Sequence, residues 1–317
     1  MNNITLDEDR ILQIISQKYP VTIEKVVKVT NEMFLCCGSH GNFYARISNE
    51  TSYEAQCEEI KWMTFLLENG VNVAPVISSY EGKLVERSIL ASTKNIVLYK
   101  EAPGRHLSST DWNASFLKIL GREIGKLHKI SKQYKQPILY LKNWYENEEY
   151  QFLKYIPEEE SIIRDVTQII TKKINEIPRT ENTYGLLHGD VWLENVLVLD
   201  NMVPTIIDFQ NCEKHYFVYD LAVPLYSALE FTFRGNGNLL DYQRSITEAL
   251  LEGYSEESTI SSEMCKLLPL FMKLKEVFEY SLMHMYWPQE KQREEHIRIM
   301  NLYRQRLENF DISNLLI

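Results

Sequence analysis

One stretch of the sequence, residues 184–222, constrains the fold of this chain more than any other segment. It reads YGLLHGDVWLENVLVLDNMVPTIIDFQNCEKHYFVYDLA and contains two short apolar runs, 195–199 and 204–207. Between the runs stand Asp200 and Asn201, which are residue types that favour turns. Two strand-like runs separated by turn residues predict a β-hairpin.

Polar residues stand at both outer ends of this predicted hairpin. Asp190 and Asn195 come at its beginning, and Asp208 follows its second strand. Because a hairpin brings its outer ends together, we expect these three side chains to converge. Carboxylate and amide oxygens are hard ligands that suit Mg²⁺, which proteins usually hold with one or two carboxylates and substrate phosphates.

The spacing of these residues resembles the catalytic and metal-binding loops of kinases. The pattern H-G-D-x-x-x-x-N, followed by I-D-F, parallels the H-R-D-x-x-x-x-N and D-F-G motifs of protein kinases. Gly189 replaces the arginine and Gln210 replaces the final glycine. With these departures, and with Asp220 in the segment YDLA, the stretch resembles the aminoglycoside phosphotransferase and choline kinase superfamily, the small-molecule branch of the kinase fold.

The resemblance implies a role for each residue of the motif. Asp190 would accept or orient the proton of a substrate hydroxyl, while Asn195 and Asp208 would hold Mg²⁺. Three further residues would shape the loop, with the last anchoring it by hydrogen bonds: His188, Gly189 and Asp220.

Upstream, the resemblance places a phosphate-binding cation on a strand. Residues 42–47 predict that strand, and Arg46 takes the place of the lysine in the kinase pattern V-A-I-K. Arginine keeps the charge and offers two parallel donors to phosphate oxygens. Residues 53–68 have helical periodicity. This helix would supply the ion-pair partner of Arg46, with Glu59 preferred and Glu58 as the alternative.

Two other nucleotide contacts follow from the same resemblance. The phosphate-binding turn would lie between strands 21–29 and 33–37, and Thr30 would contact phosphate there although the turn contains no glycine. Strand 95–99 would lead into the segment that links the lobes and offers backbone groups to adenine. Lys100 and Ala102 are the candidates by position.

The remaining periodicity predicts a sheet followed by helices. Further strands are expected at 73–78 and 83–86, and helices at 6–18, 116–129, 161–177, 222–231, 239–254, 260–287 and 290–309. We therefore predict an α+β, two-lobed, protein-kinase-like fold. Its small N-terminal nucleotide-binding lobe, with an antiparallel sheet, would span 1–101. Its larger, mostly helical lobe for catalysis and substrate binding would span 102–317.

Composition narrows the partners and the compartment. A net charge of −10 disfavours nucleic-acid binding and fits a neutral or cationic small molecule. Residues 144–160 are rich in glutamate and aromatic side chains and could contact an amine. The five cysteines form no C-x-x-C pair, and neither a signal peptide nor a long apolar run is visible. We expect a cytoplasmic protein without membrane association.

These observations predict an ATP- and Mg²⁺-dependent phosphotransferase. It would transfer the γ-phosphate to a hydroxyl group of a small molecule such as an aminoglycoside, choline or homoserine. One alternative is a catalytically silent nucleotide-binding scaffold with the same fold. Another is a protein kinase, which the missing H-R-D arginine, D-F-G and A-P-E segments disfavour.

Overall fold

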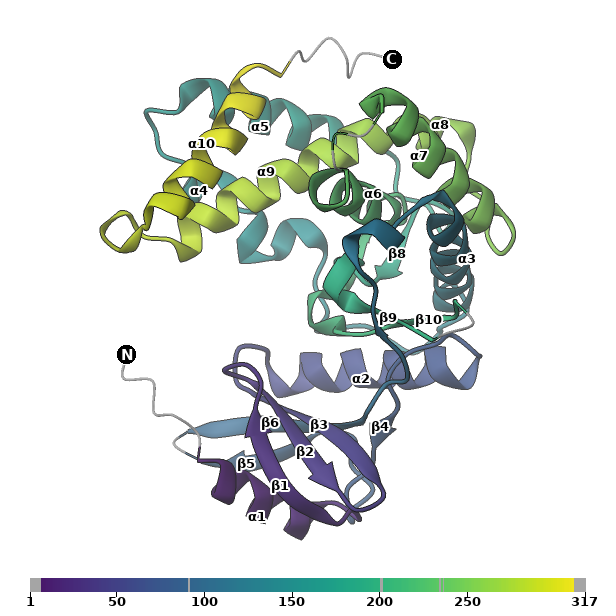
Figure 1. Cartoon of the computed structure of the whole chain (residues 1–317), viewed down its shortest axis with the longest axis vertical. Coiled ribbons are helices and arrows are strands. Elements are labelled where there is room, and N and C mark those ends of the chain that lie inside the picture. The colour runs from purple at the N-terminus through teal and green to yellow at the C-terminus, as the bar shows by residue number, and fades with distance from the viewer. Residues whose placement is uncertain (1–6, 91, 200–201, 234, 236, 311–317) are drawn as a thin grey trace. The chain divides into compact units, whose positions relative to one another are not determined.

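The structure is a computed structural model that describes residues 7–90, 92–199, 202–233, 235 and 237–310 (Figure 1). These residues form two compact units. The first comprises the chain up to Leu107 with the segments Gln133–Leu141 and Glu194–Asn211, and the second comprises Ser108–Lys132, Lys142–Leu193 and the chain from Cys212 onward. The sequence predicts a single boundary after residue 101, whereas the first unit runs to Leu107 and also includes two later segments.

The first unit is built on an antiparallel sheet (Figure 1). The strand order is β1-β2-β3-β6-β4, and β5 also pairs with β6. The strands are β1 (Ile23–Lys28), β2 (Met33–Gly38), β3 (Gly41–Ser48), β4 (Val76–Ile77), β5 (Glu86–Ile89) and β6 (Thr93–Lys100). The predicted strand 83–86 overlaps β5 only at Glu86. Lys83 belongs instead to a tight turn, in which the Ser79 N–H donates to the Lys83 carbonyl (2.8 Å).

Two helices accompany this sheet, α1 (Glu8–Lys18) and α2 (Tyr53–Glu68). Side chains alternate along a strand, so β3 presents different residues to its two faces. Ala45 and Ile47 join the apolar core that α1 contributes to. Arg46 points to the opposite face, where it meets α2. The first residue of the predicted helix 6–18 lies outside the described residues.

The predicted hairpin is present as β9 (Val196–Val198) and β10 (Pro204–Ile206). Its expected turn residues, Asp200 and Asn201, lie outside the described residues. A third short strand, β7 (Arg105–His106), pairs with β9 and was not predicted. Gly104 allows this pairing, because a Cβ atom there would lie 2.7 Å from the Val198 backbone, and its φ of +110° favours glycine.

Helices dominate the second unit. They are α3 (Ala114–Ser131), α4 (Phe152–Tyr155), α5 (Ser161–Asn175), α6 (Tyr219–Phe231), α7 (Leu239–Ser255), α8 (Ser262–Lys266), α9 (Leu268–Tyr286) and α10 (Glu294–Glu308). A two-stranded antiparallel ladder, β8 (Tyr184–Leu187) with β11 (Glu213–Tyr216), accompanies them. Helices α3 and α7 can approach closely because Gly253 has no side chain. A Cβ atom at this position would lie only 1.8 Å from the Lys118 carbonyl oxygen.

The predicted helix 260–287 is wrong in one respect, because the structure divides it into α8 and α9. Pro269 lies in the first turn of α9. Proline lacks the N–H that a continuous helix would need, but its fixed φ suits the start of a new helix. The segment therefore breaks at Leu267.

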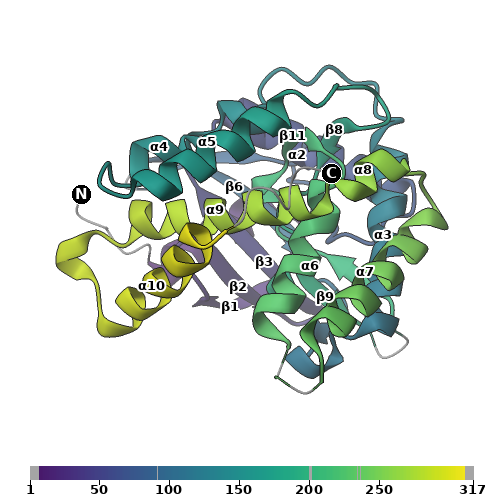
Figure 2. The same cartoon turned by 90° about the horizontal axis from the view of Figure 1, so that it is seen from above.

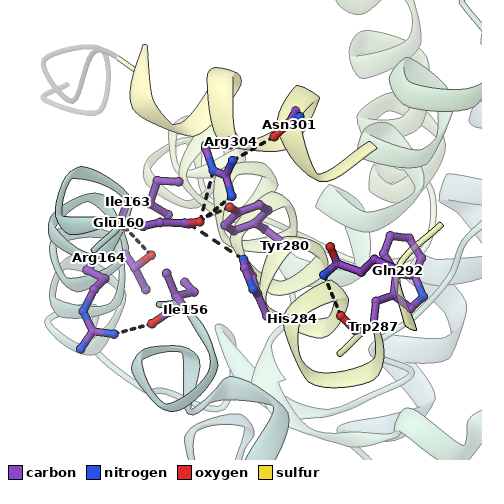
Figure 3. A network of polar contacts seen from close by, with 11 residues as sticks. Ile156, Glu160, Ile163, Arg164, Tyr280, His284, Trp287, Gln292, Asn301 and Arg304 are labelled. Atoms are coloured by element: carbon purple, nitrogen blue, oxygen red, sulfur yellow. Dashed lines mark hydrogen bonds and ion pairs between the residues drawn. The ribbon is translucent and has the colours of Figure 1, made fainter. Parts of the chain in front are cut away.

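A polar network connects α5, α9 and α10, which Figure 2 shows near one another in the second unit. Glu160 accepts hydrogen bonds from Arg304 (2.7 Å) and from the Tyr280 hydroxyl (2.6 Å), and His284 lies 3.9 Å away (Figure 3). The network borders a cavity of about 320 Å³. Within the described residues, no helix is long and apolar enough to cross a membrane.

Candidate active site

The loop after β8 carries the histidine and aspartate of the predicted motif. Gly189 has a φ of +84°, a conformation that glycine adopts without steric cost. The backbone N–H of Asp190 donates to Nδ1 of the buried His188 (3.1 Å). Because Nδ1 accepts this bond, the neutral His188 ring must carry its proton on Nε2. The loop is thus shaped by residues on both sides of its glycine.

Asp220, in the first turn of α6, anchors this loop by hydrogen bonds. Its two carboxylate oxygens accept hydrogen bonds from the backbone N–H groups of His188 (2.9 Å) and Gly189 (2.8 Å). These are the bonds that an anchoring role requires. Burial alone would raise the pKa of Asp220, but the hydrogen bonds from the His128 side chain and the His188 backbone contribute to lowering it below its ordinary value.

His128, on α3, completes this arrangement. Its Nε2 lies 3.1 Å from Asp220 and its Nδ1 lies 3.0 Å from the Tyr254 hydroxyl. Complete burial lowers the pKa of His128 below its ordinary value, so the ring is neutral at neutral pH. The sequence analysis gave His128 no role, and the structure places it as the residue that orients Asp220.

Asp190 itself contacts a residue that the sequence analysis did not identify. Nζ of Lys275, on α9, lies 3.1 Å from Oδ1 of Asp190 and 2.7 Å from Oε1 of Glu279. The only sequence signal was a lysine within the apolar stretch that becomes α9. That lysine is 85 positions from Asp190, so no local pattern could pair them.

In the first unit, the β9–β10 hairpin positions Asn195 and Asp208. The Ile207 N–H donates to the Asn195 carbonyl (3.0 Å), so the ladder continues to the outer ends of the hairpin. Asp208 has a φ of +63°, an uncommon conformation for a residue other than glycine. The next residue, Phe209, packs edge-on against Trp62 of α2, with ring centroids 5.5 Å apart. Strained backbone of this kind is frequent at functional sites.

Arg46 of β3 forms a buried ion pair with Glu59 of α2, with Nη2 and Oε1 2.6 Å apart. When the Gln56 amide is oriented to match its neighbours, its oxygen accepts two further bonds from Arg46, at 2.9 and 3.1 Å. Burial would lower the pKa of Arg46, but the negative charges of Glu59 and Asp208 contribute to raising it. The guanidinium is therefore charged and lies within electrostatic range of Asp208.

The alternative partner, Glu58, has a different position. Its carboxylate accepts hydrogen bonds from three consecutive backbone N–H groups, those of Leu139 (2.8 Å), Tyr140 (2.8 Å) and Leu141 (2.9 Å). Glu58 thereby ties α2 to the segment Gln133–Leu141 of the same unit. Neighbouring glutamates of one helix thus serve separate purposes.

The other predicted nucleotide contacts lie at the ends of strands. The Thr30 hydroxyl accepts the N–H of Met33 (3.0 Å), and the Thr30 N–H donates to the Met33 carbonyl (3.0 Å), which closes the turn between β1 and β2. Lys100 ends β6, exposes its side chain and donates its N–H to Pro75 (2.8 Å). Ala102 is buried. Their nucleotide contacts stay predictions.

The acidic, aromatic segment 144–160 is largely a packing element. Trp144, Phe152 and Ile156 are buried. Tyr150 donates to the buried carboxylate of Glu213 (2.9 Å), and Asn147 also donates to it. Two of the aromatic residues that could attract an amine, Trp144 and Phe152, are therefore part of the second unit's interior, whereas Tyr145 is exposed.

A metal ion would find hard oxygen donors at Asn195 and Asp208, which suit Mg²⁺ when substrate phosphates complete the coordination. The described residues contain no group of three or more histidine, cysteine or acidic side chains that could hold a metal by themselves. This donor set therefore fits an ion that arrives with a nucleotide. Asp190, which belongs to the second unit, can accept a proton, and its convergence with Asn195 and Asp208 stays a prediction.

Comparisons with known proteins agree with this arrangement. The sequence pattern of the Phosphotransferase enzyme family matches residues 23–256. Amicoumacin kinase from Bacillus subtilis (strain 168) is 24% identical over 323 residues, which cover 97% of this chain and 96% of that protein.

Solved structures show the same fold. The structure of amicoumacin kinase hAmiN in complex with AMP-PNP, Ca²⁺ and Ami has a TM-score of 0.87 at 23% identity, and covers 98% of this chain and 97% of that chain. A microcompartment-associated aminopropanol kinase has a TM-score of 0.76 at 18% identity, with 95% of each chain covered.

The predicted kinase-like fold, with an N-terminal antiparallel sheet followed by mostly helical structure, is therefore confirmed. The match to a family of phosphotransferase enzymes, together with the similarity to amicoumacin kinase, favours a small-molecule kinase over the protein kinase and the silent scaffold that the sequence left open. The chain belongs to the phosphotransferase enzyme family and is a small-molecule kinase.

Proposed function

We propose that this protein transfers the γ-phosphate of ATP to a hydroxyl group of an amine-bearing small molecule, with an amicoumacin-like compound as the first candidate. The observation that carries the proposal is the loop at Asp190. Asp220 accepts hydrogen bonds from two successive backbone N–H groups there, which fixes the conformation of the loop. A reacting hydroxyl must be positioned by groups that are themselves held in place.

In the proposed reaction, the acceptor oxygen forms a bond to the γ-phosphorus while the bond from that phosphorus to the bridging oxygen breaks. The electron pair of the broken bond leaves with ADP, and the hydroxyl proton passes to the carboxylate of Asp190. Phosphoryl transfer passes through a loose, anionic transition state, so positioning and charge neutralisation provide most of the catalysis. Asp190 aligns the hydroxyl and Arg46 neutralises phosphate charge.

Asn195 and Asp208 would hold Mg²⁺, which would supply positive charge to neutralise the phosphates. Asp208 is exposed, whereas Asn195 is buried beneath the hairpin. Thr30, Lys100 and Ala102 would contact the nucleotide. Glu59 keeps the Arg46 guanidinium in one orientation through their ion pair.

Three observations support an amine-bearing acceptor. The relatives include kinases named for amicoumacin and for aminopropanol, the latter an amino alcohol by name. The net charge of −10 favours the approach of a cation. The cluster of Asp190, Lys275 and Glu279 carries one more negative than positive charge, and so can attract an ammonium group.

The test is a phosphorylation assay with MgATP and five acceptors: amicoumacin, aminopropanol, choline, homoserine and an aminoglycoside. Phosphorus NMR of the product identifies a phosphate ester, and mass spectrometry identifies the modified acceptor. We expect amicoumacin to give the highest kcat/KM. A higher kcat/KM with a different acceptor would refute amicoumacin as the preferred substrate. If none of the five compounds gives a phosphate ester, the proposed acceptor class is refuted.

A further inference from the structure

Lys275 is a buried cation that lies beside Asp190. Its side chain is 7% exposed, yet its ammonium contacts two carboxylates, Oδ1 of Asp190 at 3.1 Å and Oε1 of Glu279 at 2.7 Å. It also lies 5.1 Å from the centroid of the Phe278 ring. The ammonium thus bridges helix α9 and the loop that carries Asp190.

The charge of this lysine is retained despite its burial. Burial by itself would lower the pKa of Lys275, but the negative charges of Asp190 and Glu279 raise it well above its ordinary value. Tyr219 of α6 is the other titratable group that faces it, and complete burial raises the pKa of that phenol as well. Lys275 is therefore an ammonium over the whole working range.

Glu279 makes this contact directional. It lies one helical turn after Lys275 on α9, so the lysine is held from its own helix while it reaches Asp190 on another element. A lysine side chain has considerable rotamer freedom, and a second carboxylate restricts it. The pair therefore acts as a fixed donor toward Oδ1 of Asp190.

We infer that Lys275 is a positioning residue for the phosphoryl transfer: it fixes the carboxylate of Asp190 in one orientation, so that this carboxylate can align the acceptor hydroxyl. This inference rests on the proposed function of Asp190. The lysine touches neither substrate nor nucleotide in this role and acts through Asp190 alone. Displacing a positioned group by about 1 Å can cost about 10²-fold in rate.

The experiment compares Lys275→Met and Lys275→Gln, which remove the charge, with Lys275→Arg, which keeps it. We expect kcat/KM for the acceptor to fall about 10²-fold in the two uncharged variants, and the arginine variant to recover at least about tenfold of that loss. Nucleotide affinity, measured by calorimetry, should change less than about threefold. The matched control is Lys273→Met, which removes another lysine of α9, one paired with Glu276, and should leave kcat/KM unchanged.

The comparison of kcat with KM separates positioning from simple stabilisation. Loss of an interaction that is made only in the transition state lowers kcat and kcat/KM equally, so the KM for the acceptor should change little in the uncharged variants. The arginine variant should recover kcat. If Lys275→Met does not fold, Lys275→Gln carries the same test.

Two results would overturn the inference. One is a folded, uncharged variant with wild-type kcat and kcat/KM. The other is an equal loss in all three variants that follows their melting temperatures, which would make Lys275 a structural residue. Asp190→Asn separates the proposed function of Asp190 from the inference about Lys275. If Asp190→Asn is fully active, the proposed function of Asp190 is refuted. If Asp190→Asn is impaired while Lys275→Met is fully active, only the inference about the lysine is refuted.

Discussion

Removing one partner of the buried Arg46–Glu59 ion pair should destabilise the first unit strongly. Glu59→Gln keeps the shape of the side chain but removes its charge. The two side chains are only 5% and 3% exposed, so the Arg46 guanidinium would lose its principal counter-charge where water cannot replace it. Breaking a buried pair in this way usually costs about 3–5 kcal/mol.

The structure places this variant toward the lower end of that range. Glutamine can still accept a hydrogen bond, and the charge of Asp208 also acts on Arg46. We therefore expect a loss of about 2–4 kcal/mol. Each kcal/mol lowers the melting temperature of a domain of this size by about 2–4 °C, so scanning calorimetry should record a drop of about 4–16 °C.

The chain offers a control with similar geometry and different burial. Lys83 and Glu81 are 2.5 Å apart, but their side chains are 50% and 68% exposed. Exposed pairs contribute about 0–1 kcal/mol, so Glu81→Gln should change the melting temperature little. The double variant Arg46→Met with Glu59→Leu should regain part of the lost stability, because it leaves no buried charge. Equal effects of Glu59→Gln and Glu81→Gln would refute the reasoning from burial.

Three further predictions concern the helical unit and α2. Burial raises the pKa of Glu213 from 4.5 to about 8, so folding binds a proton between these pH values and stability falls as pH rises through them. The melting temperature of Glu213→Gln, relative to that of wild type, should therefore rise between pH 5 and 8.5. A difference between the two melting temperatures that stays constant over this range would contradict the prediction. Gly253→Ala should lower stability to urea by about 1–3 kcal/mol or more, because its Cβ would meet the Lys118 carbonyl at 1.8 Å; an unchanged midpoint would disprove the close approach. Glu58→Ala should speed amide hydrogen exchange at 139–141, whose N–H groups lose their acceptor, and unaltered exchange there would count against the contact.

The sequence was informative where neighbouring residues determine the structure. The hairpin was predictable because its apolar runs and turn residues are adjacent in the chain. The pairing of Arg46 with a glutamate of α2 was predictable because the resemblance to the kinase fold implies an ion pair between a strand cation and a glutamate of the next helix. Register along the helix still left two candidates, and only packing distinguishes Glu59 from Glu58.

The features that the sequence did not predict depend on contacts between distant segments. Lys275 meets Asp190 across 85 positions, and a lysine in an apolar helix gives no hint of its partner. The ladder of β8 and β11 was missed because each strand has four residues, too few for a clear alternation. The break before Pro269 could have been predicted from the sequence, because proline disfavours the interior of a continuous helix.

Asp190, in the function that we propose, serves the acceptor hydroxyl of a small-molecule kinase. The most direct test measures phosphate-ester formation from MgATP and amicoumacin by phosphorus NMR, with wild type and Asp190→Asn side by side. Asparagine keeps the shape of the side chain but cannot take a proton, and positioned acid–base groups contribute about 10²–10⁴-fold to rate. We predict ester formation by wild type and a fall of about that factor in Asp190→Asn, at unchanged melting temperature and ATP affinity. Ester formation at the wild-type rate in Asp190→Asn would contradict the claim.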